Sequence, residues 1–569
     1  MSRRRFDYSV PLRWQRDVRL GTRVRVPFHG RRVGAWVAEI GVTPPAGVEV
    51  REVTGVSGWG PPAGVLQLAE WGAWRWAMPV ATLLRTASPD RNVSALPAPP
   101  AGGMRPAGRA VAAGPLRPGA ALRRLPPAQD LLPAVLEVIA AAGAAGPAGP
   151  GRRSVLVLAP STGWADRLGQ RLRARGLDVA SSWAEAAAGW PVVVGSRAAA
   201  WAPVPSLAAA VVLDVHDYHD RYDAVEVVAE RAARDGAPCV LVSPCPTAVQ
   251  RARYGPLEAP ERSTERSGWP AVFVVDRRGA DPRTGLFSEE LVALAREVVA
   301  GGGRVVCVLN RAGRARLLAC AACGGLVRCA ECGRAVESAG DVLGCRRCGA
   351  ERPVVCAACG SVRLRVLRMG VGRAREELEA LLGVPVGEVS GRRTGSRDAE
   401  AAVPRTPVLV GTEAVLHRVR RAEAIVFLDF DQHLLAPRFS AGEESLALLV
   451  RAGRLVGGRG DREGGGVAGG RAGIVMVQTR LPTHDVLRAA AGGDPGLFTE
   501  LDLREALRLP PFSALATLKA DATPDLGAEG VEVSPLQPGL WLLRAPDHRT
   551  LCDAVTPLQG GVRVDPVDV

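Results

Sequence analysis

Eight of the twelve cysteines in this chain form four Cys-x-x-Cys pairs within forty residues, a spacing typical of zinc ligands. The pairs are Cys320/Cys323, Cys329/Cys332, Cys345/Cys348 and Cys356/Cys359. Two intervening residues let one tight turn present both sulfurs to the same ion, and each tetrahedral Zn²⁺ then needs a second pair. A glycine follows each pair, where a positive φ lets backbone amides turn toward sulfur. A redox dithiol or chance disulfides would explain one such pair but not four, so the spacing predicts two zinc ions.

The other four cysteines lie singly in apolar or mixed segments and are interpreted as small buried side chains: Cys239, Cys245, Cys307 and Cys552. No disulfide framework is indicated, which favours a reducing cytoplasm. The basic N-terminus lacks the apolar run of a signal peptide. The Ala-rich stretch 131–150 is interrupted by prolines, glycines and a glutamate, so no membrane segment is expected.

The N-terminal sixth of the chain is strongly basic. Residues 1–95 contain fourteen arginines against seven acidic residues, and this excess of seven is half of the whole chain's net charge of +14. Aromatic residues lie among these arginines, a mixture suited to phosphate contact and base stacking. A solvated basic surface is the alternative, because the composition favours arginine throughout: Lys519 is the only lysine. The composition favours binding to nucleic acid.

The spacing of apolar residues along the chain divides it into domains that could position the cysteines and the arginines. Alternating apolar residues in 22–28 and 33–40 predict short strands in a small β-rich domain. Residues 96–120 are rich in Pro, Ala and Gly and are expected to be a linker. Beyond residue 150, apolar strand-like runs alternate with helical stretches, and this alternation recurs after residue 270. The pattern predicts two parallel α/β lobes, the second interrupted by the cysteine pairs.

An ordered set of short motifs resembles the PriA family of primosomal replication-restart proteins, which are superfamily 2 helicases. Around the four cysteine pairs lie, in the family's order, Phe6-Asp7-Tyr8, the segment 21–28, Leu309-Asn310-Arg311, Gly370-Val371-Gly372, Gly411-Thr412-Glu413, Leu428-Asp429-Phe430-Asp431, Ala452-Gly453-Arg454 and Leu509-Pro510-Pro511-Phe512. Each motif alone is weak, but the ordered set spans nearly the whole chain.

This resemblance implies a multidomain α/β protein with two RecA-like helicase lobes. The expected parts are an N-terminal 3′-end DNA-binding domain (1–95), the linker (96–120), lobe 1 (121–265), lobe 2 (266–495) with a zinc insertion at 318–362, and a small C-terminal α/β domain (496–569). The gap before lobe 1 is too short for the family's winged-helix domain.

The resemblance also implies a nested zinc arrangement. The outer pairs, Cys320/Cys323 with Cys356/Cys359, would share one ion, and the inner pairs, Cys329/Cys332 with Cys345/Cys348, would share the other. The twelve residues between Cys332 and Cys345 suffice for a hairpin that returns to its start. Sequential pairing along the chain is the alternative.

For DNA, the resemblance implies that Phe6 and Asp7 form a pocket for a nascent 3′ end. The family's Pro-Phe-Gly turn is one residue longer here, Pro27-Phe28-His29-Gly30. Arg23 and Arg25 alternate along a strand, share a face, and are expected to contact phosphates.

The residues that hydrolyse ATP in such helicases are missing or altered. A Walker A loop needs glycines that bring amides onto phosphate and a lysine that reaches it. No such loop exists, and residues 122–129, at its expected place, contain two adjacent prolines. Lys519 lies too far along the chain to substitute.

The other motor motifs have changed as well. The family's Asp-Glu-Glu-His corresponds to the stretch that begins at Asp214, without a glutamate, and Ser-Ala-Thr corresponds to Ser243-Pro244-Cys245. Of the two arginines near residue 454, Arg454 remains and the arginine finger is replaced by Gly457. A metal cluster around Asp214 (with His216, Asp217, His219 and Asp220) is an alternative to a solvated strand end.

The prediction is a fork-binding replication-restart protein that docks other primosome proteins and the replicative helicase without hydrolysing ATP. It would act in the cytoplasm at the nucleoid, on forked or single-stranded DNA with a nascent 3′ end. Two alternatives stay open: an active ATP-dependent 3′ to 5′ DNA helicase, and a zinc-ribbon nucleic-acid-binding protein outside replication.

Overall fold

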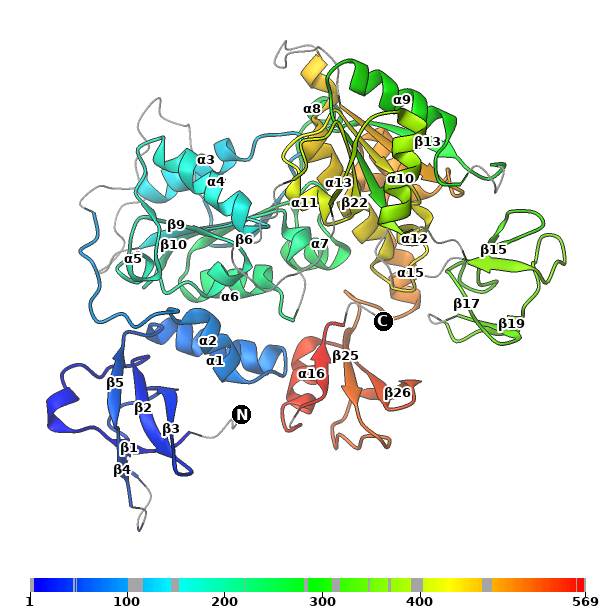
Figure 1. Ribbon diagram of the computed structural model, residues 1–569. Helices are drawn as coiled ribbons and strands as arrows, with labels where there is room; N and C mark the ends of the chain where they lie inside the picture. Colours follow the sequence, from blue (N-terminus) through cyan, green and yellow to red (C-terminus); the bar gives the residue numbers. More distant parts are fainter. Residues whose placement is uncertain are drawn as a thin grey trace. The chain divides into compact units, whose positions relative to one another are not determined.

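The computed structural model describes residues 5–44, 47, 49–100, 116–144, 153–218, 221–280, 285–309, 318–345, 348–366, 370–389, 403–462, 473–558 and 560–566 (Figure 1). Most of the expected linker, residues 101–115, lies outside this described part. The chain forms two compact units. Unit 1 comprises Met1–Arg123, Asp130–Glu258 and Asp502–Pro566, and unit 2 comprises Arg124–Gln129, Ala259–Leu501 and Val567–Val569.

The N-terminal domain of unit 1 contains the expected strands. β2 (Arg23–Phe28) pairs with β3 (Arg31–Trp36) on one side and β5 (Gly55–Gly58) on the other, all antiparallel, while β1 (Tyr8–Ser9) pairs with β4 (Arg51–Glu52). Alternation along β2 sends Val24 and Val26 into a small apolar core with Val53.

Two helices that the sequence analysis did not anticipate complete this domain: α1 (Ala63–Arg75) and α2 (Val80–Ala87). In α1, Val65, Leu68, Gly72 and Arg75 recur at helical spacing and are buried. A Cβ on Gly72 would lie 2.9 Å from both Leu83 of α2 and Trp201, so glycine permits close packing at this point.

Lobe 1 is a parallel sheet of seven strands in the order β12-β6-β11-β10-β7-β9-β8, flanked by helices (Figure 1). The strands are β6 (Gly119–Arg123), β7 (Ser154–Leu158), β8 (Val179–Ala180), β9 (Val192–Gly195), β10 (Leu207–Leu213), β11 (Pro238–Val242) and β12 (Leu257–Glu258). The main helices are α3 (Leu132–Ala144), α4 (Thr162–Arg173) and α6 (Ala224–Arg234). β7 is buried along its whole length, as expected for a strand covered on both faces. The predicted parallel α/β lobe is confirmed.

The C-terminal domain belongs to the same unit. Its antiparallel sheet, ordered β26-β27-β25-β28, carries the helix α16 (His548–Val555). The strands are β25 (Ala514–Lys519), β26 (Glu532–Gln537), β27 (Leu540–Ala545) and β28 (Val562–Val564). Side chains from α1, from lobe 1 and from β25 form one continuous apolar core. The N-terminal helices, lobe 1 and the C-terminal domain therefore pack as one body.

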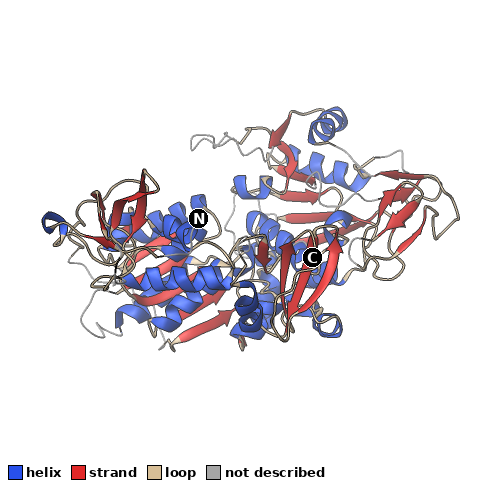
Figure 2. Ribbon diagram, turned by 90° about the horizontal axis from the view of Figure 1, so that it is seen from below, coloured by secondary structure: helices blue, strands red, loops and turns tan. Residues whose placement is uncertain are grey.

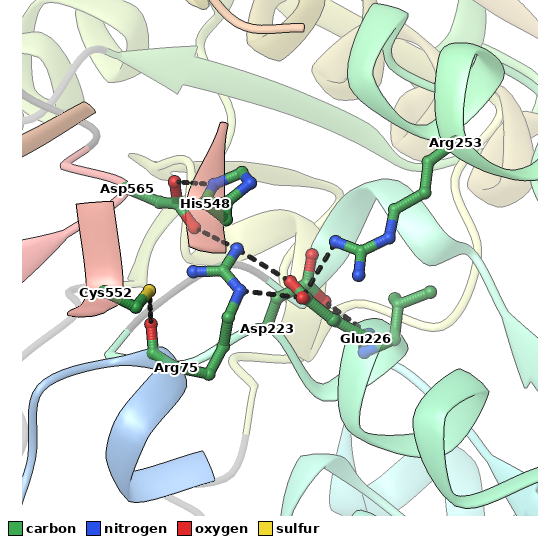
Figure 3. Close-up of polar contacts among 8 residues, drawn as sticks. Arg75, Asp223, Glu226, Arg253, His548, Cys552 and Asp565 are labelled. Atoms are coloured by element: carbon green, nitrogen blue, oxygen red, sulfur yellow. Dashed lines mark hydrogen bonds and ion pairs between the residues drawn. The ribbon is translucent and has the colours of Figure 1, made fainter. Parts of the chain in front are cut away.

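A buried charged network lies where these three parts meet (Figure 3). The Arg75 guanidinium of α1 donates to Glu226 of α6 over 2.7 and 2.9 Å, and to Asp565, beyond β28, over 2.7 Å. Arg253 also pairs with Glu226 at 2.8 Å, and His548 bonds Asp565 at 2.8 Å. Arg75 is only 3% exposed, so its charge depends on these partners.

Unit 2 is built on a second parallel sheet, ordered β13-β24-β23-β14-β22-β21. The strands are β13 (Ala271–Asp276), β14 (Val305–Leu309), β21 (Val386–Val389), β22 (Val408–Thr412), β23 (Ala424–Phe427) and β24 (Ile474–Thr479). Helices α8 (Arg262–Ser267), α9 (Glu289–Ala300), α10 (Val371–Leu382) and α13 (Ala441–Val456) accompany it. The prediction of a second lobe is confirmed.

The cysteine-rich insertion follows β14. Its described residues form two three-stranded antiparallel sheets and no helix, and short strands and loops dominate it in Figure 2. The strands are β15 (Leu318–Cys320), β16 (Leu326–Val327), β17 (Glu337–Ala339), β18 (Val342–Gly344), β19 (Glu351–Pro353) and β20 (Leu364–Val366). Across the described ranges, no helix combines the length and apolarity needed to cross a membrane.

Candidate metal centres and DNA-binding surface

All four cysteine pairs adopt the same turn. In each, the glycine after the second cysteine has a φ of +70° to +73°, and its amide donates to the carbonyl of the first cysteine over 2.9 to 3.1 Å. A side chain at these positions would strain the backbone. The glycines therefore set the direction in which each pair presents its sulfurs.

The sulfurs gather into two groups, and the grouping is the nested one. Cys320, Cys323, Cys356 and Cys359 form site 1, and Cys329, Cys332, Cys345 and Cys348 form site 2. The sulfur–sulfur distances are 3.5 Å for Cys320–Cys359 and 3.7 Å for Cys323–Cys356, and 3.5 Å for both Cys329–Cys348 and Cys332–Cys345. A tetrahedron with Zn–S bonds of about 2.3 Å has edges of about 3.8 Å. Each site thus fits one tetrahedral ion held by four thiolates.

Backbone amides prepare the first cysteine of each site for metal binding. The amides of Cys323 and Ala322 point at Cys320 Sγ and lower the pKa of that thiol to about 6. Burial acts to raise the pKa of Cys329, but amides of Cys332 and Glu331 outweigh it and lower the pKa to about 7. Burial raises the pKa of Cys332 to about 12. The Ser361 amide acts to lower the pKa of Cys359, but hydrogen bonds with Cys320 and Cys323 outweigh it and raise the pKa to about 12. A metal ion that binds these thiols as thiolates would therefore displace protons from them.

Site 2 is joined to lobe 2 through Arg334, which directly follows the glycine of its first turn. This buried guanidinium donates to the Leu434 carbonyl and lies 3.5 Å from Glu500, while the Ala335 amide donates to Leu435 over 3.2 Å. The Ala335 and Leu435 side chains are buried together. Only its position after Gly333 marks Arg334 in the sequence. These contacts fix the inserted module to lobe 2.

The predicted 3′-end pocket residues lie at the β2–β3 hairpin of the N-terminal domain. The Phe6 ring is half-exposed and meets Phe28 edge to face at 5.0 Å, and Phe28 meets His29 at 4.3 Å. The extra turn residue is accommodated because His29 and Gly30 both adopt positive φ. Asp7, next to Phe6, is exposed. The structure thus presents a partly exposed aromatic cluster, and the exposed Asp7 directly follows Phe6 in the chain.

The two arginines predicted to bind DNA have different surroundings. Arg25 is exposed on β2. Arg23 is partly buried and its guanidinium donates to the Pro89 carbonyl over 2.9 Å. Arg23 therefore contributes to the domain's own structure, and a contact with DNA stays a prediction for both residues.

The lobe 1 residues expected to correspond to the family's motor motifs lie at the carboxyl ends of the neighbouring strands β10 and β11. Asp214, directly after β10, is buried in a left-handed conformation with a φ of 52°. His216 Nδ1 lies 2.8 Å from the hydroxyl of Ser243, which follows β11. Among the described residues, the two cysteine groups alone bring ligand atoms close enough for a metal ion, and His219 and Asp220 lie outside the described part.

The segment 124–129, at the expected phosphate-loop position, packs within unit 2. Pro126 and Pro127 have no amide hydrogen. The Ala128 amide donates to Gly268 over 3.0 Å, and the Gln129 amide donates to Pro126 over 3.1 Å. Arg454 of α13 donates to the Pro127 carbonyl over 2.8 Å. Every amide from 126 to 129 is therefore absent or already bonded.

Comparison with known proteins assigns the N-terminal domain. The family model for the 3′ DNA-binding domain of PriA matches residues 2–89. Joined to two parallel α/β lobes and a module with two four-cysteine sites, this domain defines a helicase-like DNA-binding protein.

Curated relatives extend the match along the chain. "Replication restart protein PriA" of Haemophilus influenzae is 26% identical over 411 residues, which cover 65% of this chain and 54% of that protein. "Probable replication restart protein PriA" of Mycobacterium leprae is 29% identical over 595 residues, which cover 90% of this chain and 85% of that protein. The chain is thus similar to proteins named replication restart protein PriA over most of its length.

The extent of the matches varies. The chain spans about half the length of the curated relatives that it matches first, 54% for Haemophilus influenzae and 42% for Bacillus subtilis. The solved structure "S. cerevisiae Dbp5 L327V bound to RNA and ADP BeF3" is 12% identical with a TM-score of 0.35, covering 68% of this chain and 88% of that one. The lobe assignment rests on the strand orders given above.

Proposed function

We propose that this chain is a replication-restart protein that recognises abandoned forks and docks other primosome proteins and the replicative helicase. The observation that carries the proposal is the partly exposed Phe6–Phe28 pair, followed in the chain by the exposed Asp7, in a domain that matches the 3′ DNA-binding family of PriA. An aromatic pair can stack on a terminal base, and a carboxylate can accept a hydrogen bond from a 3′-hydroxyl while repelling a 3′-phosphate. The protein would act in the cytoplasm at the nucleoid.

Two zinc ions would be held by the eight thiolates of sites 1 and 2. Zinc in such a closed four-thiolate site has a structural role: it stabilises a module too small to fold on an apolar core of its own. Arg334 would keep that module fixed on lobe 2, available to DNA or to partner proteins.

ATP hydrolysis is not part of the proposed function. Binding of a γ-phosphate needs donor groups, and the segment 126–129 has no free amide to offer. The chain also lacks the phosphate-loop lysine and the arginine finger, and such a finger raises the rate by a factor of about 10³ to 10⁵. Function would then rest on binding free energy.

Two measurements on the purified full chain test this proposal. Fluorescence anisotropy should show tighter binding to a fork with a free 3′-hydroxyl than to the same fork with a 3′-phosphate, and D7N should reduce that preference. Equal affinity for both forks would remove the pocket assignment. Phosphate release from ATP should stay at background with and without forked DNA. DNA-stimulated release that disappears in R454A would favour the active 3′ to 5′ helicase instead.

A further inference from the structure

The sheet of the N-terminal domain has an outer face that its apolar core does not use. Val24 and Val26 point into the core, so Arg23, Arg25 and Pro27 of β2 point to the opposite face. In the antiparallel register, Arg25 lies between Gly34 of β3 and Gly55 of β5. The neighbouring pair on this face is Pro27 with Arg32.

One end of this outer face is covered by residues 88–93. Arg23 donates to Pro89, and the Trp36 indole donates to the Ser88 hydroxyl over 2.8 Å. A Cβ on Gly58 would lie only 2.2 Å from the Val93 carbonyl oxygen. The covered end is thus part of the folded domain, and the open part of the face begins at Arg25.

Two glycines keep the surface around Arg25 free of side chains. A Cβ on Gly34 would meet no atom within 4 Å, and a Cβ on Gly55 would meet only the Arg25 Cβ, at 3.9 Å. Neither glycine has a positive φ, so the backbone conformation does not require them. Glycine inside a strand often marks a place where another backbone approaches closely. Since strands lie about 4.8 Å apart, Gly34 and Gly55 lie about 10 Å apart, with the Arg25 side chain between them.

The charges on this open face lack partners within the described protein. Arg25 and Arg32 are exposed, and neither guanidinium has an ion pair or a side-chain hydrogen bond with any residue in the described ranges. Exposed arginines elsewhere in unit 1, such as Arg5 and Arg171, do pair with carboxylates. The open face therefore offers two donor groups suited to an anionic ligand.

We propose that this face, formed by Arg25, Arg32, Gly34 and Gly55, is a binding track for the sugar–phosphate backbone of single-stranded DNA. Phosphates complement the two unpaired guanidinium groups, and the glycines let a nucleic-acid backbone lie close to the sheet. No large exposed apolar side chain lies on the face, so it lacks the anchor that a protein partner would need.

This proposal rests on the proposed function in one respect, because the 3′-end pocket sets the direction in which the DNA strand would run across the face. Arg25 precedes Phe28 by three residues, about 10 Å along β2, and Phe28 lies on the side of Val24 and Val26, so a bound strand would have to pass the end of the hairpin to reach both. The track would therefore hold phosphates several nucleotides from a 3′ end at the Phe6–Phe28 pair. The 3′ terminus and the track are then separate contacts, one for the end and one for the strand that leads to it.

The test measures binding of the full chain to a fluorescent twelve-nucleotide single strand by anisotropy at several salt concentrations. R25A and R32A should each weaken binding about three- to tenfold and lower the salt slope by about 0.7, the value for one lost phosphate contact with a single strand. G34V changes no charge and has room for its side chain, so it should fold normally and weaken binding by obstruction. The dinucleotide dTpT, as a competitor, is too short to reach Arg25, and its affinity should not change in any of these variants.

Arg16 provides the matched control, because R16A removes one exposed charge from the same domain outside the track. Binding by R16A should change less than twofold. The proposal is overturned if G34V binds like wild type, if R25A loses no more than R16A, or if R25A affects a duplex but not the single strand. Blocking the 3′ end distinguishes the two hypotheses: if blocking has no effect while R25A and G34V still weaken binding, the track stands and the 3′-end pocket is wrong.

Discussion

Replacing Arg75 should destabilise unit 1 more than any exposed arginine would, because Arg75 joins three parts of the unit. In R75M, Glu226 and Asp565 stay in the buried junction without their shared partner (Figure 3). Removing one member of a buried ion pair costs about 3–5 kcal/mol. Glu226 keeps Arg253 and Asp565 keeps His548, so the expected cost is at the lower end, about 3 kcal/mol.

Urea unfolding followed by tryptophan fluorescence measures this cost, since Trp76 and Trp201 are buried in the same core. With a slope of about 3 kcal/mol per molar urea, R75M should lower the midpoint of unit 1 by about 1 M. The control is R234M, which removes an arginine paired with Glu230 on the surface of α6, the helix that also carries Glu226. Its expected cost is about 0.3–0.5 kcal/mol, a shift below about 0.2 M.

A double variant separates the ion pair from other effects of the substitution. R75M/E226Q should cost less than the sum of the two single variants, since the neutral side chain no longer leaves a buried charge unpaired. If R75M shifts the midpoint no more than R234M, the network does not hold the three parts together and the reasoning from burial fails.

Three further predictions concern pH, zinc and the module. Burial acts to raise the pKa of Asp565, but the Arg75 charge and the hydrogen bond with His548 outweigh it and hold the pKa well below its usual range. The Asp565 carboxylate therefore contributes to the stability of unit 1 above about pH 4, and this contribution is lost at lower pH. The difference between the urea midpoints of wild type and R75M should shrink from about pH 6 to about pH 3. A constant difference would contradict this assignment. Native mass spectrometry should find two zinc ions per chain. A chelator should empty site 1 first, because two of its cysteines (Cys323 and Cys359) are exposed, whereas in site 2 Cys348 alone is exposed and the other three lie in or against an apolar cluster. C359S leaves only site 2 complete and C345S leaves only site 1 complete, so the two variants identify the site from which zinc is lost. Loss of zinc from site 2 before site 1 would contradict this prediction. R334M should keep both zinc ions but increase proteolysis within 318–366, whereas the exposed control R363A should not; unchanged cleavage would show that other contacts hold the module.

Patterns that repeat over short distances could be predicted from the sequence. The run at β7 is apolar at every position and lies between helical stretches, so a strand buried on both faces followed directly. The nested grouping of the eight cysteines followed from the family resemblance together with four identical turns. Helix α1 was missed although Val65, Leu68 and Gly72 have helical spacing, because the strands before it suggested a wholly β-rich domain.

Contacts between distant parts of the chain could not be predicted. Arg75 looks like any basic residue at a helix end, and its partners lie 151 and 490 residues away. The shared face of Arg23 and Arg25 follows from strand alternation. Residues 88–93 fold over Arg23 and leave Arg25 open. This arrangement depends on tertiary packing, which the local sequence pattern does not reveal.

If the chain does not hydrolyse ATP, as proposed, the contacts of the segment 124–129 oppose regaining that activity by one substitution. A phosphate loop presents amide donors, whereas this segment presents the Pro127 carbonyl, an acceptor, to Arg454. An arginine that would otherwise be available to a phosphate is thereby satisfied by the backbone. Replacing Pro127 with glycine would restore one amide but leave the bonds of Ala128 and Gln129 in place. Introducing a lysine would add a cation beside Arg454 without supplying the donors that orient a phosphate. Under the proposed function, phosphate binding at this segment would therefore need both new amide donors and a lysine, which no single substitution supplies.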